Sequence, residues 1–203
     1  MERISIHPAN PQERLVSKAA DLLHRSGGIC IYPTDTVYGV GCAVSNTKAL
    51  KKIAHILHRD EERLFSFICT DFAQAETYAK IDTPTYKLMK RYLPGPFTFI
   101  LPATKFVQKK LDPKRKTVGI RIVDCVATNA LLAHFGEPLA NMSLNTAGEN
   151  RGDPDLFMTP EVVSGVDVMI DIGALDDPRG STIVDLTGDE PVLIREEKGE
   201  WNE

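Results

Sequence analysis

Apolar positions change their spacing along the chain, from a helical period in some segments to short continuous runs in others. Segment 14–25 has its leucines and alanines at a helical spacing, so we predict a helix that ends at Gly27-Gly28. Segment 28–32 is a continuous apolar run, typical of a buried strand. The same criteria predict helices at 47–59, 71–78, 83–93, 127–135 and 159–163, and strands at 64–69, 97–101, 117–122, 139–144, 168–172, 182–186 and 192–195.

This alternation of strands and helices, with connections of irregular length, predicts the fold class. We expect an α/β protein with a twisted mixed sheet and flanking helices. The last two strands are expected to form an antiparallel pair joined by a turn at Gly188-Asp189. The chain has no internal repeat or flexible linker, so a single domain over residues 1–203 is predicted.

Composition is ordinary for a soluble globular protein, with 42% hydrophobic and 26% charged residues. No apolar stretch approaches the length of a membrane helix, and no secretory leader is visible at the N-terminus, so no membrane partner is expected. The four cysteines are widely spaced and stand mostly in apolar runs. They are expected to be reduced core residues, which favours a cytoplasmic location.

The charge is unevenly distributed. The net charge of −4 argues weakly against general affinity for nucleic acid. One basic stretch nevertheless combines Lys105, Lys109, Lys110, Lys114, Arg115 and Lys116. It is either a solvated surface loop or a face that binds the phosphates of RNA, and both interpretations stay open.

Clusters of Gly, Pro, Ser, Thr and Asn stand beside several predicted strands, at 32–39, 94–98, 143–148 and 180–182. Such clusters present backbone N–H groups and hydroxyls where side chains are small. We therefore expect one polar site for an anionic, oxygen-rich ligand, as in an enzyme or a nucleotide-binding protein.

Several charged and polar residues fit such a site. Arg59 and Arg63 are four positions apart at the end of the second predicted helix, so they can point the same way. Arg121 is the charged residue of an otherwise apolar strand, and a pocket with an anion is favoured over solvent. Ser143 and Asn145 are two positions apart at a strand end and face the same side.

Other common sites are missing from the sequence. There is no phosphate-binding P-loop, no complete dinucleotide fingerprint, no G-x-S-x-G and no H-E-x-x-H. A surface or capping role is favoured for His55 and His58 over a shared metal. Asp35 is equally a candidate for Mg²⁺ coordination and for turn capping. We predict neither a resident metal nor a covalent catalytic residue.

The chain resembles the YrdC/YciO family. The matching segments are YPTDTVYG at 32–39, LPGPFT at 93–98, VGIRI at 118–122, SLN at 143–145, GSTIVD at 180–185 and IR at 194–195. They follow in family order over nearly the whole chain. Segments 6–12 and 114–117 are similar to the YciO branch in particular, and the additional C-terminal domain of longer relatives is absent from the match.

The resemblance implies a twisted α/β fold with a large concave basic cavity. It also implies a nucleotidyltransferase-like activity, in which L-threonine, bicarbonate and ATP with Mg²⁺ give threonylcarbamoyl-AMP and pyrophosphate for modification of tRNA. Binding of double-stranded RNA is a further implied property, which would give the basic stretch a use.

The resemblance also implies roles for particular residues. Thr34 matches the position that lines the threonine pocket, and Arg121 the position that pairs with the amino-acid carboxylate. The positions that match nucleotide contacts are Arg59, Arg63, Ser143, Asn145, Ser181 and Arg195.

One position departs from the synthases, which carry a lysine two residues before the arginine that Arg59 matches. Leu57 stands there and cannot supply a point charge to the triphosphate. We therefore expect weak or altered synthase activity, or a related nucleotide or carbamoyl substrate. The alternative function is a double-stranded RNA, tRNA or ribosome-associated binding protein without synthase activity.

Overall fold

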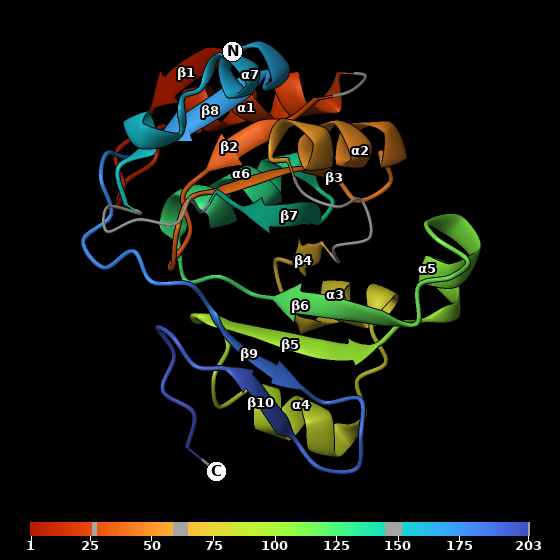
Figure 1. The fold of residues 1–203 in the computed structure, drawn as a ribbon. Coiled ribbons are helices and arrows are strands. Elements are labelled where there is room, and N and C mark those ends of the chain that lie inside the picture. Colours follow the sequence, from red (N-terminus) through yellow and green to blue (C-terminus); the bar gives the residue numbers. More distant parts are fainter. Residues whose placement is uncertain (26–27, 59–64, 145–151, 203) are drawn as a thin grey trace.

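The computed structural model describes residues 1–25, 28–58, 65–144 and 152–202. Its strands are β1 (Glu2–Ser5), β2 (Cys30–Tyr32), β3 (Gly39–Ala43), β4 (Ser66–Ile68), β5 (Phe97–Pro102), β6 (Thr117–Arg121), β7 (Leu139–Ser143), β8 (Val168–Asp171), β9 (Thr182–Asp185) and β10 (Val192–Arg195). They form one 10-stranded sheet in the order β1-β8-β2-β3-β7-β4-β6-β5-β9-β10 (Figure 1). The predicted α/β fold with a single mixed sheet is confirmed.

Parallel and antiparallel pairs alternate irregularly across the sheet. β8 is parallel to β1 and β2, and β4 is parallel to β6, while β7 is antiparallel to both β3 and β4. At the other end β5 pairs antiparallel with β6 and parallel with β9. The predicted antiparallel pair of β9 and β10 is confirmed.

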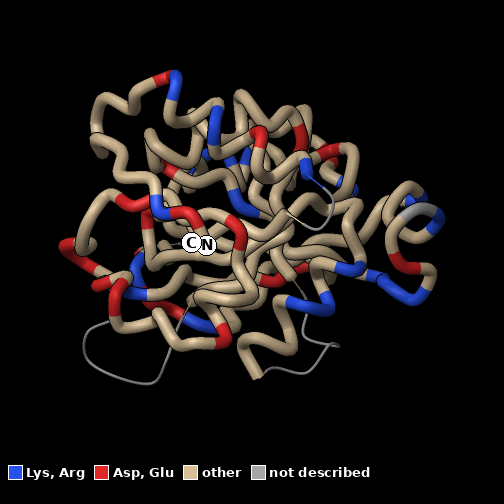
Figure 2. Tube along the Cα trace, turned by 90° about the horizontal axis from the view of Figure 1, so that it is seen from above, with Lys and Arg blue, Asp and Glu red and all other residues tan. Residues whose placement is uncertain are grey.

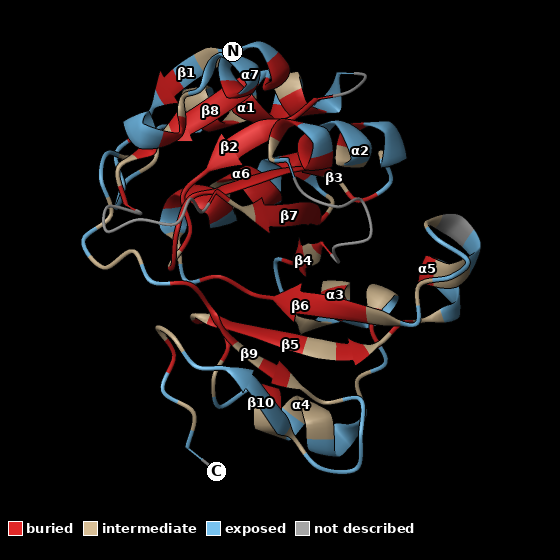
Figure 3. Cartoon of the chain, in the orientation of Figure 1, coloured by how far each residue is buried: buried red, intermediate tan, exposed pale blue. Residues whose placement is uncertain are grey.

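Helices cover both faces of the sheet. They are α1 (Glu13–His24), α2 (Thr47–Ile56), α3 (Phe72–Tyr78), α4 (Thr83–Met89), α5 (Lys105–Lys110), α6 (Val126–Phe135) and α7 (Pro160–Gly165), with a 3₁₀ turn at Pro154–Phe157. In the described ranges no helix is long and apolar enough to cross a membrane. Figure 3 shows that the central strands are buried and that β10 is exposed.

The strand β2 shows how the two faces divide. Its residues point alternately to opposite sides, as in any strand. Cys30 and Tyr32 pack in the cluster that contains α1 and α6, whereas Ile31 packs in the cluster that contains α2 and α7. The sheet is therefore the middle layer between two apolar layers, and any polar side chain on it faces one of them.

Most predicted elements are present, with differences at their ends. The helix predicted at 47–59 is α2, which ends at Ile56. The helix predicted at 83–93 is α4, which ends at Met89, well before Pro94. Segment 127–135 forms α6 and stops at Gly136, whose φ of 78° is left-handed. Strands β1 and β3, helix α5 and the 3₁₀ turn were not predicted.

Two glycines explain why the pattern of apolar residues does not predict strand β3. The Tyr32 ring crosses β3, and its hydroxyl donates to Oδ1 of Asn141 on β7 at 2.9 Å. A Cβ at Gly39 would collide with that oxygen, and a Cβ at Gly41 would lie 2.7 Å from the Tyr32 hydroxyl. Small residues are needed here for close approach, so β3 lacks the alternating pattern of a typical strand.

Candidate functional site

Polar side chains cross the central strands on the face that carries Tyr32. The amide of Asn141 donates to Oγ of Ser66 at 3.2 Å, and Thr98 and Ser181 share a hydrogen bond of 2.8 Å between their hydroxyls. Between these pairs stands Gly119, where a Cβ would lie 3.2 Å from Thr98 and 3.4 Å from Ser66. We call this set the polar row: Tyr32, Asn141, Ser66, Thr98 and Ser181.

Arg121 ends β6 on the same face, opposite Ile68 of β4 in the pairing register. It is almost completely buried, with 2% of its surface exposed. Its Nη2 donates to Oδ1 of Asp35 at 2.7 Å and to Oγ1 of Thr36 at 3.0 Å. The sequence predicted an anion for this buried arginine, and within the chain that anion is Asp35.

Asp35 connects two segments that are distant in the sequence. Its Oδ1 belongs to the ion pair with Arg121, and its Oδ2 accepts from the backbone N–H of Asp124 at 3.0 Å. Both carboxylate oxygens are therefore engaged by protein donors. Of the two roles considered for Asp35, this geometry corresponds to capping a loop, here the chain that leaves β6.

The two threonines beside Asp35 form a directed chain of hydrogen bonds. The Thr34 hydroxyl donates to the carbonyl of Val37 at 2.6 Å. Because that uses its proton, it accepts from the Thr36 hydroxyl at 2.8 Å, while Thr36 accepts from Arg121. The guanidinium thus fixes the orientation of both hydroxyls.

One donor of Arg121 is left over. Its Nε is buried and has no hydrogen-bond partner among the described residues. Buried donors normally have a partner, because burying one without a hydrogen bond is unfavourable. An acceptor on a ligand would complete this site, and a carboxylate suits a guanidinium because it can accept from two of its N–H groups.

A second group of polar residues lies at the other end of the polar row. Arg195 of β10 donates from Nη2 to the Ser181 carbonyl at 2.7 Å, and its Nε lies 2.9 Å from Oε1 of Glu197. The structure thus brings together Ser181 and Arg195, which the sequence placed in one nucleotide site. Thr98 fixes the Ser181 side chain through a hydrogen bond that the sequence did not predict.

Ser143 lies at the end of β7, where it pairs with Gly39 at the level of Tyr32. Its side chain is partly buried. The predicted site residues Asn145, Arg59 and Arg63 lie outside the described residues.

The basic stretch begins with α5, which projects from the body of the molecule (Figure 1). Lys and Arg gather on this side in Figure 2. Four lysine side chains are exposed, those of Lys105, Lys109, Lys114 and Lys116, and Lys110 is the last residue of α5.

Arg115 differs from these lysines. Its guanidinium donates to the backbone carbonyls of Phe65 and Thr117 and lies over the Phe67 ring, 4.8 Å from the centroid. Burial lowers the pKa of Arg115. Arg115 therefore anchors the stretch to the core, while the lysines face solvent.

The cysteines are free, and three of the four are fully buried, as predicted. Burial raises the pKa of Cys42 and of Cys69 to about 12, so both remain thiols at neutral pH. In the described part of the chain no group of three His, Cys, Asp or Glu residues is arranged to hold a metal.

These features define a class of protein: an α/β sheet with a row of polar side chains and a buried arginine on one of its faces. Comparisons with known proteins identify the family. The Sua5/YciO/YrdC family model, described as "Telomere recombination", matches residues 23–197. The chain belongs to this family.

Two relatives illustrate the range of the family. "Uncharacterized protein YciO" of Escherichia coli K12 is 37% identical over 198 residues, which cover 96% of this chain and 95% of the relative. A "Putative threonylcarbamoyl-AMP synthase" of Methanocaldococcus jannaschii is 31% identical over 95% of this chain and 91% of its own length. The family thus includes named synthases.

Solved structures agree with this assignment. The crystal structure of E. coli YciO aligns with a TM-score of 0.87 and 36% identity over 98% of both chains. P. abyssi Sua5 complexed with L-threonine aligns with a TM-score of 0.85 and 27% identity. That alignment covers 97% of this chain and 58% of Sua5, so the chain corresponds to part of the longer protein.

The ion pair of Arg121 and Asp35 leads to a prediction about stability. The substitution Asp35→Asn leaves a buried guanidinium without its counter-charge, so the free energy of unfolding should fall by about 3–5 kcal/mol. Urea denaturation followed by circular dichroism measures the change. The exposed neighbour Asp124 supplies the matched control, because Asp124→Asn removes the same charge from solvent. Equal stability of the two variants would contradict the role given to Asp35.

Proposed function

We propose that this protein is an ATP-dependent enzyme of the threonylcarbamoyl-AMP synthase type, with weak or altered activity. The reaction joins L-threonine, bicarbonate and ATP into threonylcarbamoyl-AMP and releases pyrophosphate and water. The observation that carries the proposal is the buried Arg121, whose Nε has no partner in the described structure.

In this proposal Arg121 binds the threonine carboxylate. Asp35 and Thr36 both accept from Nη2, which leaves the Nε donor for a ligand oxygen. Thr34 lies in the same hydrogen-bonded chain, two residues from Thr36. The family relationship with P. abyssi Sua5, whose structure is a complex with L-threonine, supports a threonine ligand.

The nucleotide would lie along the polar row, beyond Arg121. Ser143, Ser181 and Arg195 are the described residues that we assign to it, and Arg59, Arg63 and Asn145 remain motif-based assignments. We expect Mg²⁺ to arrive with ATP, because it commonly binds through phosphates and keeps several waters. The large concave basic cavity implied by the family also remains a prediction.

The proposed chemistry needs no covalent intermediate with the protein. Adenylate formation requires a carbamate oxygen held in line with the α-phosphorus while charge on the leaving pyrophosphate is offset. Arginine side chains and hydroxyls can perform both tasks through position and charge alone. The buried thiols fit this interpretation, since they remain protonated and supply no nucleophile.

The altered activity is inferred from Leu57. This residue caps α2, and its side chain is half-buried against the apolar cluster below the helix. An apolar contact thus replaces the positive charge that synthases present to the triphosphate. Binding of the amino acid at Arg121 does not depend on this position, so the deficit should fall on phosphate chemistry.

Calorimetric titration tests the site directly. We expect ATP with Mg²⁺ to bind, and its affinity to rise about fivefold or more when threonine and bicarbonate are present, because the ligands share one site. The variant Arg121→Lys keeps the charge opposite Asp35 but removes Nε, so this gain should disappear. Absence of heat with all three small molecules would contradict the synthase proposal.

Leu57→Lys should increase the rate of pyrophosphate release. Restoring a charge at the phosphates can change a rate on the order of 10²-fold, and Leu57→Met is the control that keeps the side chain apolar. A coupled pyrophosphate assay with threonine, bicarbonate and ATP compares both variants with the parent. Rapid release by the parent protein would contradict the claim of weak activity.

A second candidate function is binding of double-stranded RNA or tRNA, and the exposed lysines around α5 favour it. We expect affinity for an RNA duplex to fall steeply with salt, because each phosphate contact releases counterions. Replacing Lys109 and Lys114 by Gln should reduce the salt slope by about two. Lys18→Gln, on the distant α1, is the control, and an unchanged slope in the double variant would contradict this function.

The free, mostly buried cysteines are consistent with a cytoplasmic location, which we also propose.

A further inference from the structure

After β10 the chain turns back and runs along the residues that precede β9. We call residues 196–202 the C-terminal strap. The backbone N–H of Lys198 donates to the Gly180 carbonyl at 3.1 Å. The Thr182 hydroxyl accepts from the N–H of Glu197 at 3.0 Å and donates to the Gly199 carbonyl at 2.5 Å. The strap is therefore bonded on both sides of Ser181.

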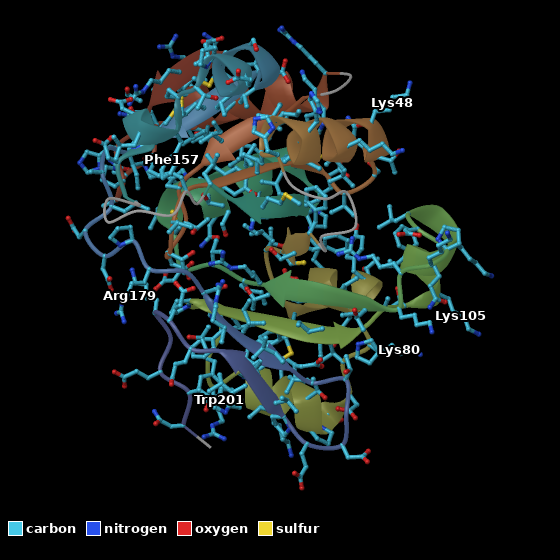
Figure 4. The ribbon with its side chains drawn as sticks, in the orientation of Figure 1. Lys48, Lys80, Lys105, Phe157, Arg179 and Trp201 are labelled. Carbon is cyan, nitrogen blue, oxygen red and sulfur yellow. The ribbon has the colours of Figure 1, made fainter. Side chains whose placement is uncertain are left out.

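An aromatic anchor holds the far end of the strap. Trp201 stacks on Tyr92 with ring centroids 4.7 Å apart, and the Tyr92 hydroxyl donates to the Asn202 carbonyl at 2.5 Å. Between these contacts Gly199 passes the Phe97 ring so closely that a Cβ would lie 2.5 Å from it. Figure 4 labels Trp201 on the side of the molecule that carries β9 and β10.

Glu197 joins the strap to the candidate site. One carboxylate oxygen accepts from the Gly180 N–H at 2.5 Å, and the other pairs with Nε of Arg195 at 2.9 Å. Arg195 in turn donates to the carbonyl of Ser181. A closed ring of interactions thus fixes the backbone on both sides of the Ser181 hydroxyl and the direction of the Arg195 guanidinium.

We propose that Glu197 is a positioning residue and that docking of the strap orders Ser181 and Arg195 for the phosphates of the bound nucleotide. The inference rests on the proposed function for the identity of the ligand, but the ordering itself belongs to the free protein. A ligand that needs these residues in place favours the docked strap, and by reciprocity the docked strap strengthens ligand binding.

The chain contains one tryptophan, Trp201, which reports directly on the strap. The first variant is Glu197→Gln, which removes the ion pair with Arg195 but keeps an acceptor for Gly180. The second is Gly199→Ala, which forces the strap away from Phe97 and alters no side chain of the site. Glu200→Gln is the matched control, because Glu200 is an exposed carboxylate of the same strap.

Three readouts are compared in the full chain: acrylamide quenching of Trp201, amide exchange of residues 180–182, and affinity for ATP with Mg²⁺. We expect Glu197→Gln and Gly199→Ala to weaken ATP binding about tenfold, whereas Glu200→Gln behaves as the parent. Gly199→Ala should also speed amide exchange and expose Trp201, and ATP should protect Trp201 in the parent.

The outcomes separate this inference from the proposed function. If ATP does not bind the parent protein, the proposed function fails, and the ordering role is then judged from amide exchange alone. Unchanged exchange at residues 180–182 in Gly199→Ala would overturn the ordering role. An exposed Trp201 with undiminished ATP affinity would overturn the coupling between strap and site.

Discussion

The ion pair between Arg121 and Asp35 is the interaction on which the candidate site depends. Both side chains are almost fully buried, so neither charge is stable there without the other. The pair ties the loop after β2 to the end of β6, and through Thr36 it orients the Thr34 hydroxyl. The same pairing uses Nη2 and leaves Nε without a partner in the described residues. In the proposed function, one side chain thus serves both the structure and the ligand.

Glycines make the polar face possible. A sheet covered by helices on both faces normally fills its central positions with apolar side chains. Here Gly39 and Gly41 leave space for the Tyr32 ring to reach Asn141, and Gly119 leaves space between Ser66 and Thr98. Polar groups from separate strands therefore meet on one face, where they form hydrogen bonds with one another. A larger side chain at these positions would separate them.

Periodicity predicted the elements that have a clear apolar face, such as α1 and α2. It missed β3, because the glycines of that strand give no alternating pattern of apolar residues. For the site, a charged residue in an apolar strand was enough to identify Arg121. Its partner could not be predicted, because Asp35 lies 86 positions away and only the tertiary fold brings them together. Asn141 was missed in the same way, although an amide inside an apolar strand is a comparable signal. The assignments of Arg59, Arg63 and Asn145 rest on motifs alone.

The proposed amino-acid and nucleotide contacts differ in how many segments of the chain supply them. Arg121, Asp35 and the two threonines form a group whose contacts come from two segments, residues 34–37 and 121–124. In the proposed function the nucleotide depends instead on separate segments: the segment after α2, the end of β7, Ser181 and a strap that returns from the C-terminus. Electrostatic stabilisation of phosphates falls when any one donor is missing or misplaced. Under the proposed function, an amino-acid site built in this way can persist while the phosphate site changes, and Leu57 in place of a charge is the change that we propose for this chain.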